Sequence, residues 1–160
     1  MNSVRILSGN DSQLITDNSS DNEHATTEES DAIADIEEKL DIKMPEFYYR
    51  PYGMEYMTYE ISEPASAAKI NYQYDDNIVT FYIDKQNQST ASNINSSNGE
   101  EKIIDTIEKE GYKVTLKKLQ EQNEKNLTYV AQWEYNGCAY SWSGKFRIEE
   151  LKKIIKEMKF

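Results

Sequence analysis

The chain has 160 residues, the size of about one domain, and its 29 acidic and 18 basic side chains give a net charge of −11. Such a surface repels nucleic-acid phosphates and anionic lipids, because Lys and Arg carry most of the affinity for both. A single His and a single Cys exclude a His/Cys zinc site within one chain and a disulfide framework. No apolar run approaches the roughly 20 residues of a membrane-spanning helix.

The first 30 residues differ in composition from the rest of the chain. Residues 1–30 hold one basic residue, six acidic residues and no aromatic residue, so we expect an acidic, flexible leader or tether. The alternative is an irregular arm that docks on the domain through Ile6, Leu7, Leu14 and Ile15. Residues 31–160 hold all 18 aromatic residues and predict a single α+β domain. The polar stretch 86–100 predicts a mobile loop.

A helix is the first predicted element of this domain. Ser30 is a suitable N-cap, and apolar residues then recur at helical spacing at Ile33, Ile36 and Leu40. We expect the helix to end before Pro45, because the residue before a proline avoids the helical region. Residues 45–53 predict an extended, aromatic connection.

Three strands are predicted next. The first covers Met54 to Ser62. In the second, Ala68, Ile70, Tyr72 and Tyr74 alternate with polar residues, and the third shows the same period from Val79 to Ile83. Turn-forming residues occupy 75–77, so the second and third strands should form a hairpin.

Residues 101–110 fit two structures. Ile103, Ile104 and Ile107 match a helix that Gly111 would close, but they also match a strand that enters a hairpin. The strand from Tyr112 to Leu116 is predicted more plainly by its alternation.

The strongest hairpin signal lies near the end of the chain. Asn136-Gly137 separates two strands, and both residues accept the positive φ of a two-residue turn. The predicted register is therefore Tyr135 with Cys138, Trp133 with Tyr140, and Ala131 with Trp142.

A final helix follows Gly144. Its apolar stripe consists of Ile148, Leu151, Ile154, Ile155 and Met158, and its charges suit the helix dipole. The whole pattern predicts the α+β class, with a curved antiparallel sheet of about six strands covered on one face by an N-terminal and a C-terminal helix.

The end of the chain resembles a known family. The Trp-containing strand from Leu127, the Asn136-Gly137 turn, the Tyr-containing strand to Gly144 and the helix from Ile148 are similar to domain of unknown function 4367. The short helix, Pro45 and the Tyr-rich strand extend the resemblance over about 31–160. It implies an extracytoplasmic, cell-surface domain of membrane-anchored proteins in Gram-positive bacteria. A membrane helix usually precedes such domains. This chain has none, so the resemblance implies either a soluble fragment or a member that has lost the anchor. The acidic leader 1–30 would then be the tether between membrane and domain.

Few residues of this sequence suggest chemistry. His24 lies in the predicted leader, and we expect it to be solvated rather than a base or a metal ligand. Cys138 would need a base to act as a nucleophile, and we expect a small buried residue. Asp75-Asp76-Asn77 has the oxygen ligands of a calcium site but reads as an ordinary turn. Glu60 and Glu63 are the carboxylate pair considered for glycoside hydrolysis. We expect no catalytic residue, no metal, no cofactor and no enzymatic activity.

Tyrosines are concentrated in the first half of the domain, with eight between residues 48 and 82. They fit either a sheet lining or a binding surface, because Tyr offers a rigid ring with a polar tip. Within 47–59, aromatic residues occupy both odd and even positions of an extended chain, so some of their rings should face solvent, a ligand or a partner. The candidate surface consists of Tyr48, Tyr49, Tyr52, Tyr56 and, if it lies nearby, Tyr82. Trp133, Tyr140 and Trp142 could form a ligand platform, but the last helix should cover them.

These observations favour a non-enzymatic binding or sensing module. It would contact a protein, a peptide or an envelope component through the Tyr-rich surface, and it would bind no nucleic acid. The alternative hypothesis is a carrier or sensor of a hydrophobic small molecule, held in a pocket between sheet and helices.

Overall fold

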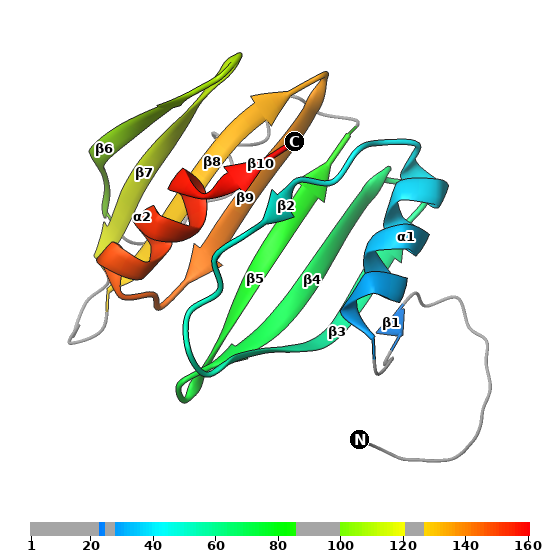
Figure 1. The fold of residues 1–160 in the computed structure, drawn as a ribbon, viewed down its shortest axis with the longest axis horizontal. Helices are drawn as coiled ribbons and strands as arrows, with labels where there is room; N and C mark the ends of the chain where they lie inside the picture. Colours follow the sequence, from blue (N-terminus) through cyan, green and yellow to red (C-terminus); the bar gives the residue numbers. More distant parts are fainter. Residues whose placement is uncertain (1–22, 25–27, 86–99, 121–126) are drawn as a thin grey trace.

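The computed structural model describes residues 23–24, 28–85, 100–120 and 127–160. These residues form an antiparallel sheet of eight strands in the order β1-β3-β4-β5-β9-β8-β7-β6 (Figure 1). The strands are β1 (Glu23–His24), β3 (Met54–Ser62), β4 (Ala67–Tyr74), β5 (Asn77–Asp84), β6 (Glu100–Lys109), β7 (Tyr112–Gln120), β8 (Thr128–Tyr135) and β9 (Cys138–Gly144). The six predicted strands are all present, and β6 and the two-residue β1 join them.

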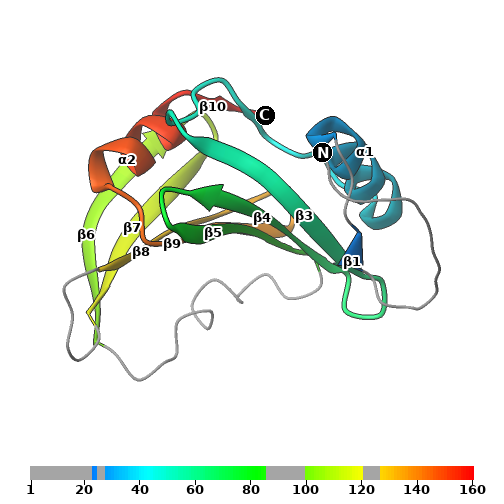
Figure 2. The same cartoon turned by 90° about the horizontal axis from the view of Figure 1, so that it is seen from below.

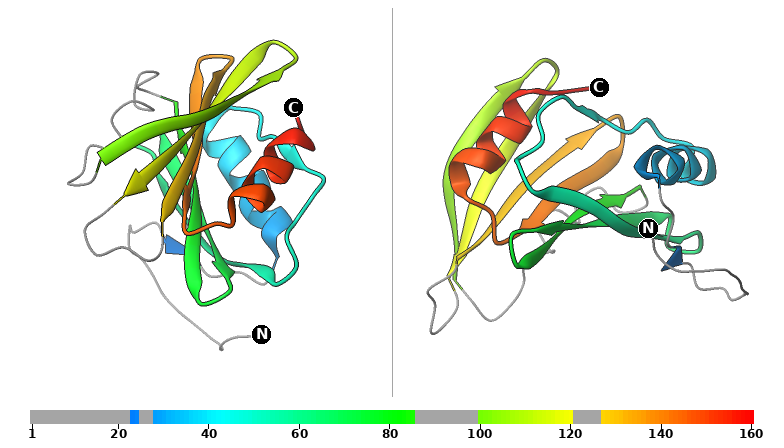
Figure 3. Two further views of the ribbon diagram at one scale, coloured as in Figure 1. Left: turned by 90° about the vertical axis from the view of Figure 1, so that its left-hand side faces the viewer. Right: turned by 60° about the horizontal axis from the view of Figure 1, so that its bottom comes forward.

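Two helices lie on the concave face of this sheet (Figures 2 and 3). The first, α1 (Glu29–Leu40), packs on β3 and β4, and the second, α2 (Ile148–Lys156), packs near β6. Between the helices runs the connection 41–53. It contains β2 (Glu46–Phe47), which pairs with β10 (Met158–Lys159) near the end of the chain. The predicted α+β class, with one helix from each end of the domain on one face, is confirmed.

Both predicted hairpins are present, and the register predicted for the second of them is confirmed. In β8–β9, Tyr135 pairs with Cys138, Trp133 with Tyr140, and Ala131 with Trp142. The turn residues Asn136 and Gly137 have φ of 51° and 76°, the conformation for which these residue types are suited. The β4–β5 hairpin turns at Asp75-Asp76, and Asp75 also has a positive φ of 56°.

Residues 101–110 form a strand rather than a helix. In β6, Ile107 pairs with Val114 of β7, and the β6–β7 hairpin turns through Gly111 at φ 90°. The register shifts between Ile103 and Asp105, so Ile104 forms a bulge. Residues 101–110 fit a helix or a strand locally, and the strand forms because its backbone hydrogen-bonds with β7.

The start of α1 differs from the prediction. The helix begins at Glu29, with Glu28 at the N-cap and no side-chain cap, so Ser30 as N-cap is wrong. Acidic residues in the first turn, Glu29 and Asp31, complement the helix dipole instead. At the other end Asp41 adopts φ 55° and ends the helix before Pro45, as expected. The last helix also ends earlier than its stripe suggested, because Met158 lies in β10.

Most of the predicted leader 1–30 and of the predicted loop 86–100 lies outside the described residues. Where they are described, Glu23–His24 forms β1 against β3, Glu29 and Ser30 belong to α1, and Glu100 begins β6.

The core is aromatic and lies between the sheet and the helices. Trp142 is 1% exposed, and its ring lies 5.0 Å from Phe81 and 5.3 Å from Phe47. The Trp133 and Tyr140 rings stack at 5.7 Å between centroids on neighbouring strands, and the two residues are 3% and 1% exposed. These rings are therefore core, as expected, and not an exposed ligand platform. Phe47 brings the connection 41–53 down onto this core.

Candidate ligand groove

A groove of about 470 Å³ lies between α1 and the connection 41–53. Its volume falls within the range of about 300–1,000 Å³ that ligand sites occupy. Apolar and charged side chains line it together. The apolar ones are Ile33, Ala34, Met44, Pro45 and Phe47, and the charged ones are Glu29, Glu37, Lys43, Glu46 and Arg50, with Ser30 beside them.

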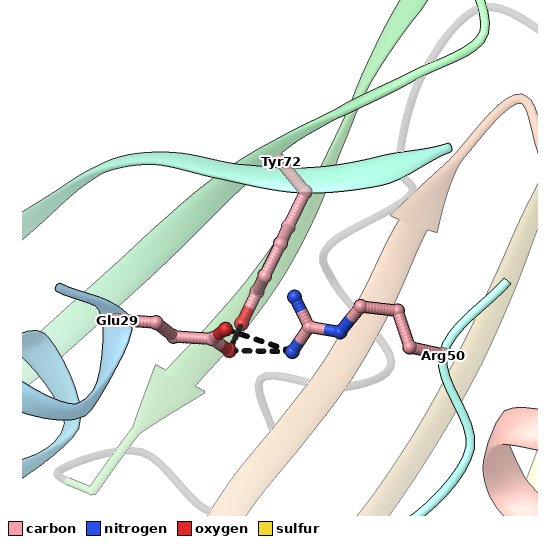
Figure 4. Close-up of polar contacts among 3 residues, drawn as sticks. All are labelled: Glu29, Arg50 and Tyr72. Carbon is pink, nitrogen blue, oxygen red and sulfur yellow. Dashed lines mark hydrogen bonds and ion pairs between the residues drawn. The ribbon is translucent and has the colours of Figure 1, made fainter. Parts of the chain in front are cut away.

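One end of the groove is fixed by a three-residue clamp, Glu29, Arg50 and Tyr72 (Figure 4). The Tyr72 hydroxyl donates a hydrogen bond of 2.6 Å to Glu29 Oε2, and Arg50 Nη2 lies 2.8 Å from both carboxylate oxygens. The Arg50 guanidinium also lies over the Tyr72 ring, 5.2 Å from its centroid. Burial and the charge of Glu29 raise the pKa of Tyr72 well above 10.0, so its hydroxyl stays a donor. The clamp joins α1, the connection and β4.

The start of the connection is held by hydrogen bonds to α1 and to the sheet. Glu37 Oε2 accepts a hydrogen bond of 2.9 Å from the backbone N–H of Met44. Met44 is 3% exposed. The backbone carbonyl of Lys43 accepts a hydrogen bond of 2.8 Å from the Tyr140 hydroxyl. The connection is thus tied to the helix on one side and to the sheet on the other.

The predicted tyrosines divide between surface and interior. Tyr48 is 63% exposed and Tyr52 is 99% exposed. Tyr49 is half-buried, and its hydroxyl donates to Glu150 while Lys153 Nζ lies 4.7 Å from its ring centroid. Tyr48 donates to Glu46, a groove residue, and Lys159 lies 5.8 Å from its ring. These three therefore lie on the connection, and Tyr48 lies beside the groove.

Tyr56 and Tyr82 do not join this surface. The Tyr56 ring packs edge-on against Tyr72 at 6.3 Å, and its hydroxyl is buried without a hydrogen-bond partner among the described residues. Tyr82 follows the buried Phe81 in β5, so it lies on the opposite face of the sheet from the helices. The structure does not bring Tyr82 near the other four.

A bulge in β3 explains the aromatic residues of both parities. The register shifts between Tyr56 and Thr58, which leaves Met57 as the extra residue. Tyr56 pairs with Tyr72 and Tyr59 with Ile70, so both rings face the helices although they are three residues apart. Tyr59, 7% exposed, donates to Asp35 of α1 at 2.6 Å. Of the rings in 47–59, Tyr48 and Tyr52 are exposed, as expected of some of them, whereas the bulge turns Tyr56 and Tyr59 toward the helices.

The residues that the sequence suggested for chemistry lie outside the groove lining. Cys138 is 1% exposed, and burial raises the pKa of its thiol to about 11, which disfavours the thiolate. Asp75 pairs with Arg147 at 3.1 Å, and Glu60 lies 3.4 Å from Lys69. In the part of the chain that the structure describes, no group of three or more His, Cys, Asp and Glu residues could hold a metal ion. His24 pairs with Tyr59 in the β1–β3 register.

A second, much smaller space lies beside the connection. It measures about 10 Å³ and is lined by Phe47, Tyr49, Arg50, Met54, Trp142 and Ile154. Such a volume holds about one water molecule. This space is too small for the hydrophobic ligand that the alternative hypothesis requires.

Sequence reasoning missed the groove and its clamp. Glu29 was assigned to the leader, and Ala34 was not singled out. One signal was available: Arg50 is the sole basic residue between positions 44 and 68, and it lies among aromatic residues. A lone cation in such a segment predicts an ion pair or a contact with a ring.

Comparisons with known proteins bear on the family. No curated protein and no solved structure matches the chain. Among the described residues, no helix is long and apolar enough to span a membrane. One family model matches residues 44–158, from the groove's Met44 to the last strand. The match covers most of the chain, and the protein therefore belongs to the family described as Domain of unknown function (DUF4367).

Proposed function

We propose that this protein is a non-enzymatic binding module whose groove holds an extended, cationic segment of a partner protein or peptide. The observation that carries the proposal is the groove itself, lined by apolar and charged side chains together, with the exposed Tyr48 beside it. Apolar lining residues can anchor side chains of a peptide, and polar ones can fix its orientation.

Charge supports a cationic partner. Residues 28–85, which contain the groove, hold 14 acidic and 5 basic side chains, a net charge of −9. The described residues 100–120 and 127–160 hold 9 acidic and 11 basic side chains, a net charge of +2. The acidic charge is therefore concentrated in the part of the domain that forms the groove, and it would steer a basic segment toward it.

Backbone geometry supports an extended segment. The β2 strand lies between β10 and α1 (Figure 1). Among the described residues it pairs with β10 alone, so its other edge has no strand partner. An extended peptide in the groove would find main-chain hydrogen-bonding groups along that edge.

The test is a selection followed by a matched pair of variants. A display library of random decapeptides is selected on the immobilised full chain, and the enriched peptides are measured by calorimetry. The Ala34→Trp change fills the groove from an exposed position of α1, and Glu38→Trp places the same ring on an exposed position outside it. We expect peptides rich in Lys or Arg with an apolar residue, and at least a tenfold loss of affinity in Ala34→Trp alone.

Two outcomes would contradict the proposal. Equal binding to both Trp variants would place the peptides elsewhere. Failure to enrich any basic peptide, with binding instead to purified cell-wall glycan, would replace the protein partner by an envelope component. The extracytoplasmic location, which rests on the family resemblance, is part of the same proposal, and protease digestion of the protein on intact cells tests it.

A further inference from the structure

The outer edge of β3 is a second place where backbone groups can be paired. The inner edge of β3 pairs with β4 from Met54 to Ser62. On the outer edge, the described strand partner is β1, which is two residues long and lies at the rim of the sheet (Figure 2). Strand edges attract extended chains, because their N–H and C=O groups form a ready row of partners.

The chain's own leader provides an example of this pairing. Glu23 pairs with Glu60 and His24 with Tyr59, in antiparallel register. The two following residues of β3, Ile61 and Ser62, have no described strand partner on this edge. A longer strand could therefore continue the same register past β1.

The register also shows that the leader is a poor complement to this edge. Glu23 and Glu60 are two acidic residues at directly opposite positions, and like charges so placed destabilise an antiparallel pair. On its other side Glu60 faces an opposite charge instead, because Lys69 of β4 lies 3.4 Å from its carboxylate in an exposed contact. A strand with Lys or Arg opposite Glu60 would pair better than the leader does.

We propose that the outer edge of β3 is a strand-addition site for an extended protein segment that places Lys or Arg opposite Glu60, and that Glu23–His24 occupies this site until such a segment displaces it. The site is separate from the groove and uses backbone pairing at the sheet edge. The leader acts there as a weak competitor within the same chain.

The test uses two labelled peptides and the full chain. Both peptides have the sequence of residues 19–28, and one carries Lys in place of Glu at the position of Glu23. The Glu23→Pro/His24→Pro variant removes the backbone donors of β1, and fluorescence anisotropy measures binding. We expect the Lys peptide to bind roughly fivefold more tightly than the Glu peptide. We expect both to bind the proline variant more tightly than the native chain.

Charge reversal provides the matched control. The Glu60→Lys change should invert the preference, so that the Glu peptide binds more tightly. The Glu55→Lys change makes the same substitution on the same strand, opposite Gln73, and should leave the preference unchanged. The proposal is overturned if neither peptide binds the proline variant saturably, or if Glu55→Lys and Glu60→Lys alter the preference equally. Either result leaves the groove proposal intact, because groove peptides are tested with Ala34→Trp.

Discussion

Replacing Tyr72 with Phe removes one hydroxyl from the clamp that joins α1, the connection and β4. That hydroxyl donates to Glu29 over 2.6 Å, and the Tyr72 ring is 1% exposed. A hydrogen bond to a charged acceptor contributes about 1.5–3 kcal/mol. The Glu29 side chain is 22% exposed and keeps Arg50, so we expect a loss near the lower end, about 1.5 kcal/mol.

The matched control is Tyr56→Phe. Tyr56 contacts the Tyr72 ring, but its buried hydroxyl has no hydrogen-bond partner among the described residues. Removing an unsatisfied buried hydroxyl is close to neutral or stabilising. Urea unfolding, monitored by circular dichroism, gives the change in the free energy of unfolding for both variants. Equal losses in Tyr56→Phe and Tyr72→Phe would refute the clamp, because the hydrogen bond to Glu29 would then contribute nothing.

Three further predictions concern pH, packing and thiol reactivity. The pKa of Tyr72 is higher in the folded protein than in the unfolded chain, so the neutral phenol adds to the free energy of unfolding. This contribution is complete below about pH 10 and is lost as the pH rises further. The Tyr72→Phe change should therefore make the free energy of unfolding fall less steeply at alkaline pH. An unchanged slope in pH-dependent urea unfolding would contradict this. A Cβ at Gly144 would lie 2.5 Å from Val79 Cγ1 and 2.9 Å from Val79 Cα, so Gly144→Ala should cost about 2 kcal/mol or more in the same assay. Cys138 should react with a disulfide reagent only slowly at pH 8 in the native state, and at an ordinary rate in denaturant.

The sequence predicts the hairpins well because their information is local. Asn136-Gly137 favours a two-residue turn, and that turn alone sets Trp133 opposite Tyr140. The strand from Ala67 to Tyr74 is equally plain, since its apolar residues alternate without a break. Residues 101–110 are different, because the spacing of Ile103, Ile104 and Ile107 satisfies both helix and strand periods. Pairing with the adjacent strand β7 decides the outcome, and the turn between them, Glu110-Gly111, is a weaker hairpin signal than Asn136-Gly137.

The candidate site is harder to predict because it depends on contacts between distant segments. Glu29 and Tyr72 are separated by 43 positions, and nothing local marks them as partners. The bulge at Met57 has no residue signature, yet it turns Tyr59 inward beside Tyr56. Tyr48 and Tyr52 were identified as exposed candidates from aromatic density alone, and density does not distinguish them from Tyr56.

The groove is tested most directly by mapping a bound peptide onto the chain. A basic decapeptide from the selection is titrated into isotopically labelled full-length protein, and backbone amide chemical shifts are recorded by NMR. The account predicts that the largest shifts fall on Ile33, Ala34 and the 43–47 segment, and that the Ala34→Trp change removes them. Shifts concentrated on β6 and β7, or shifts that persist in Ala34→Trp, would contradict the assignment of this groove as the binding site.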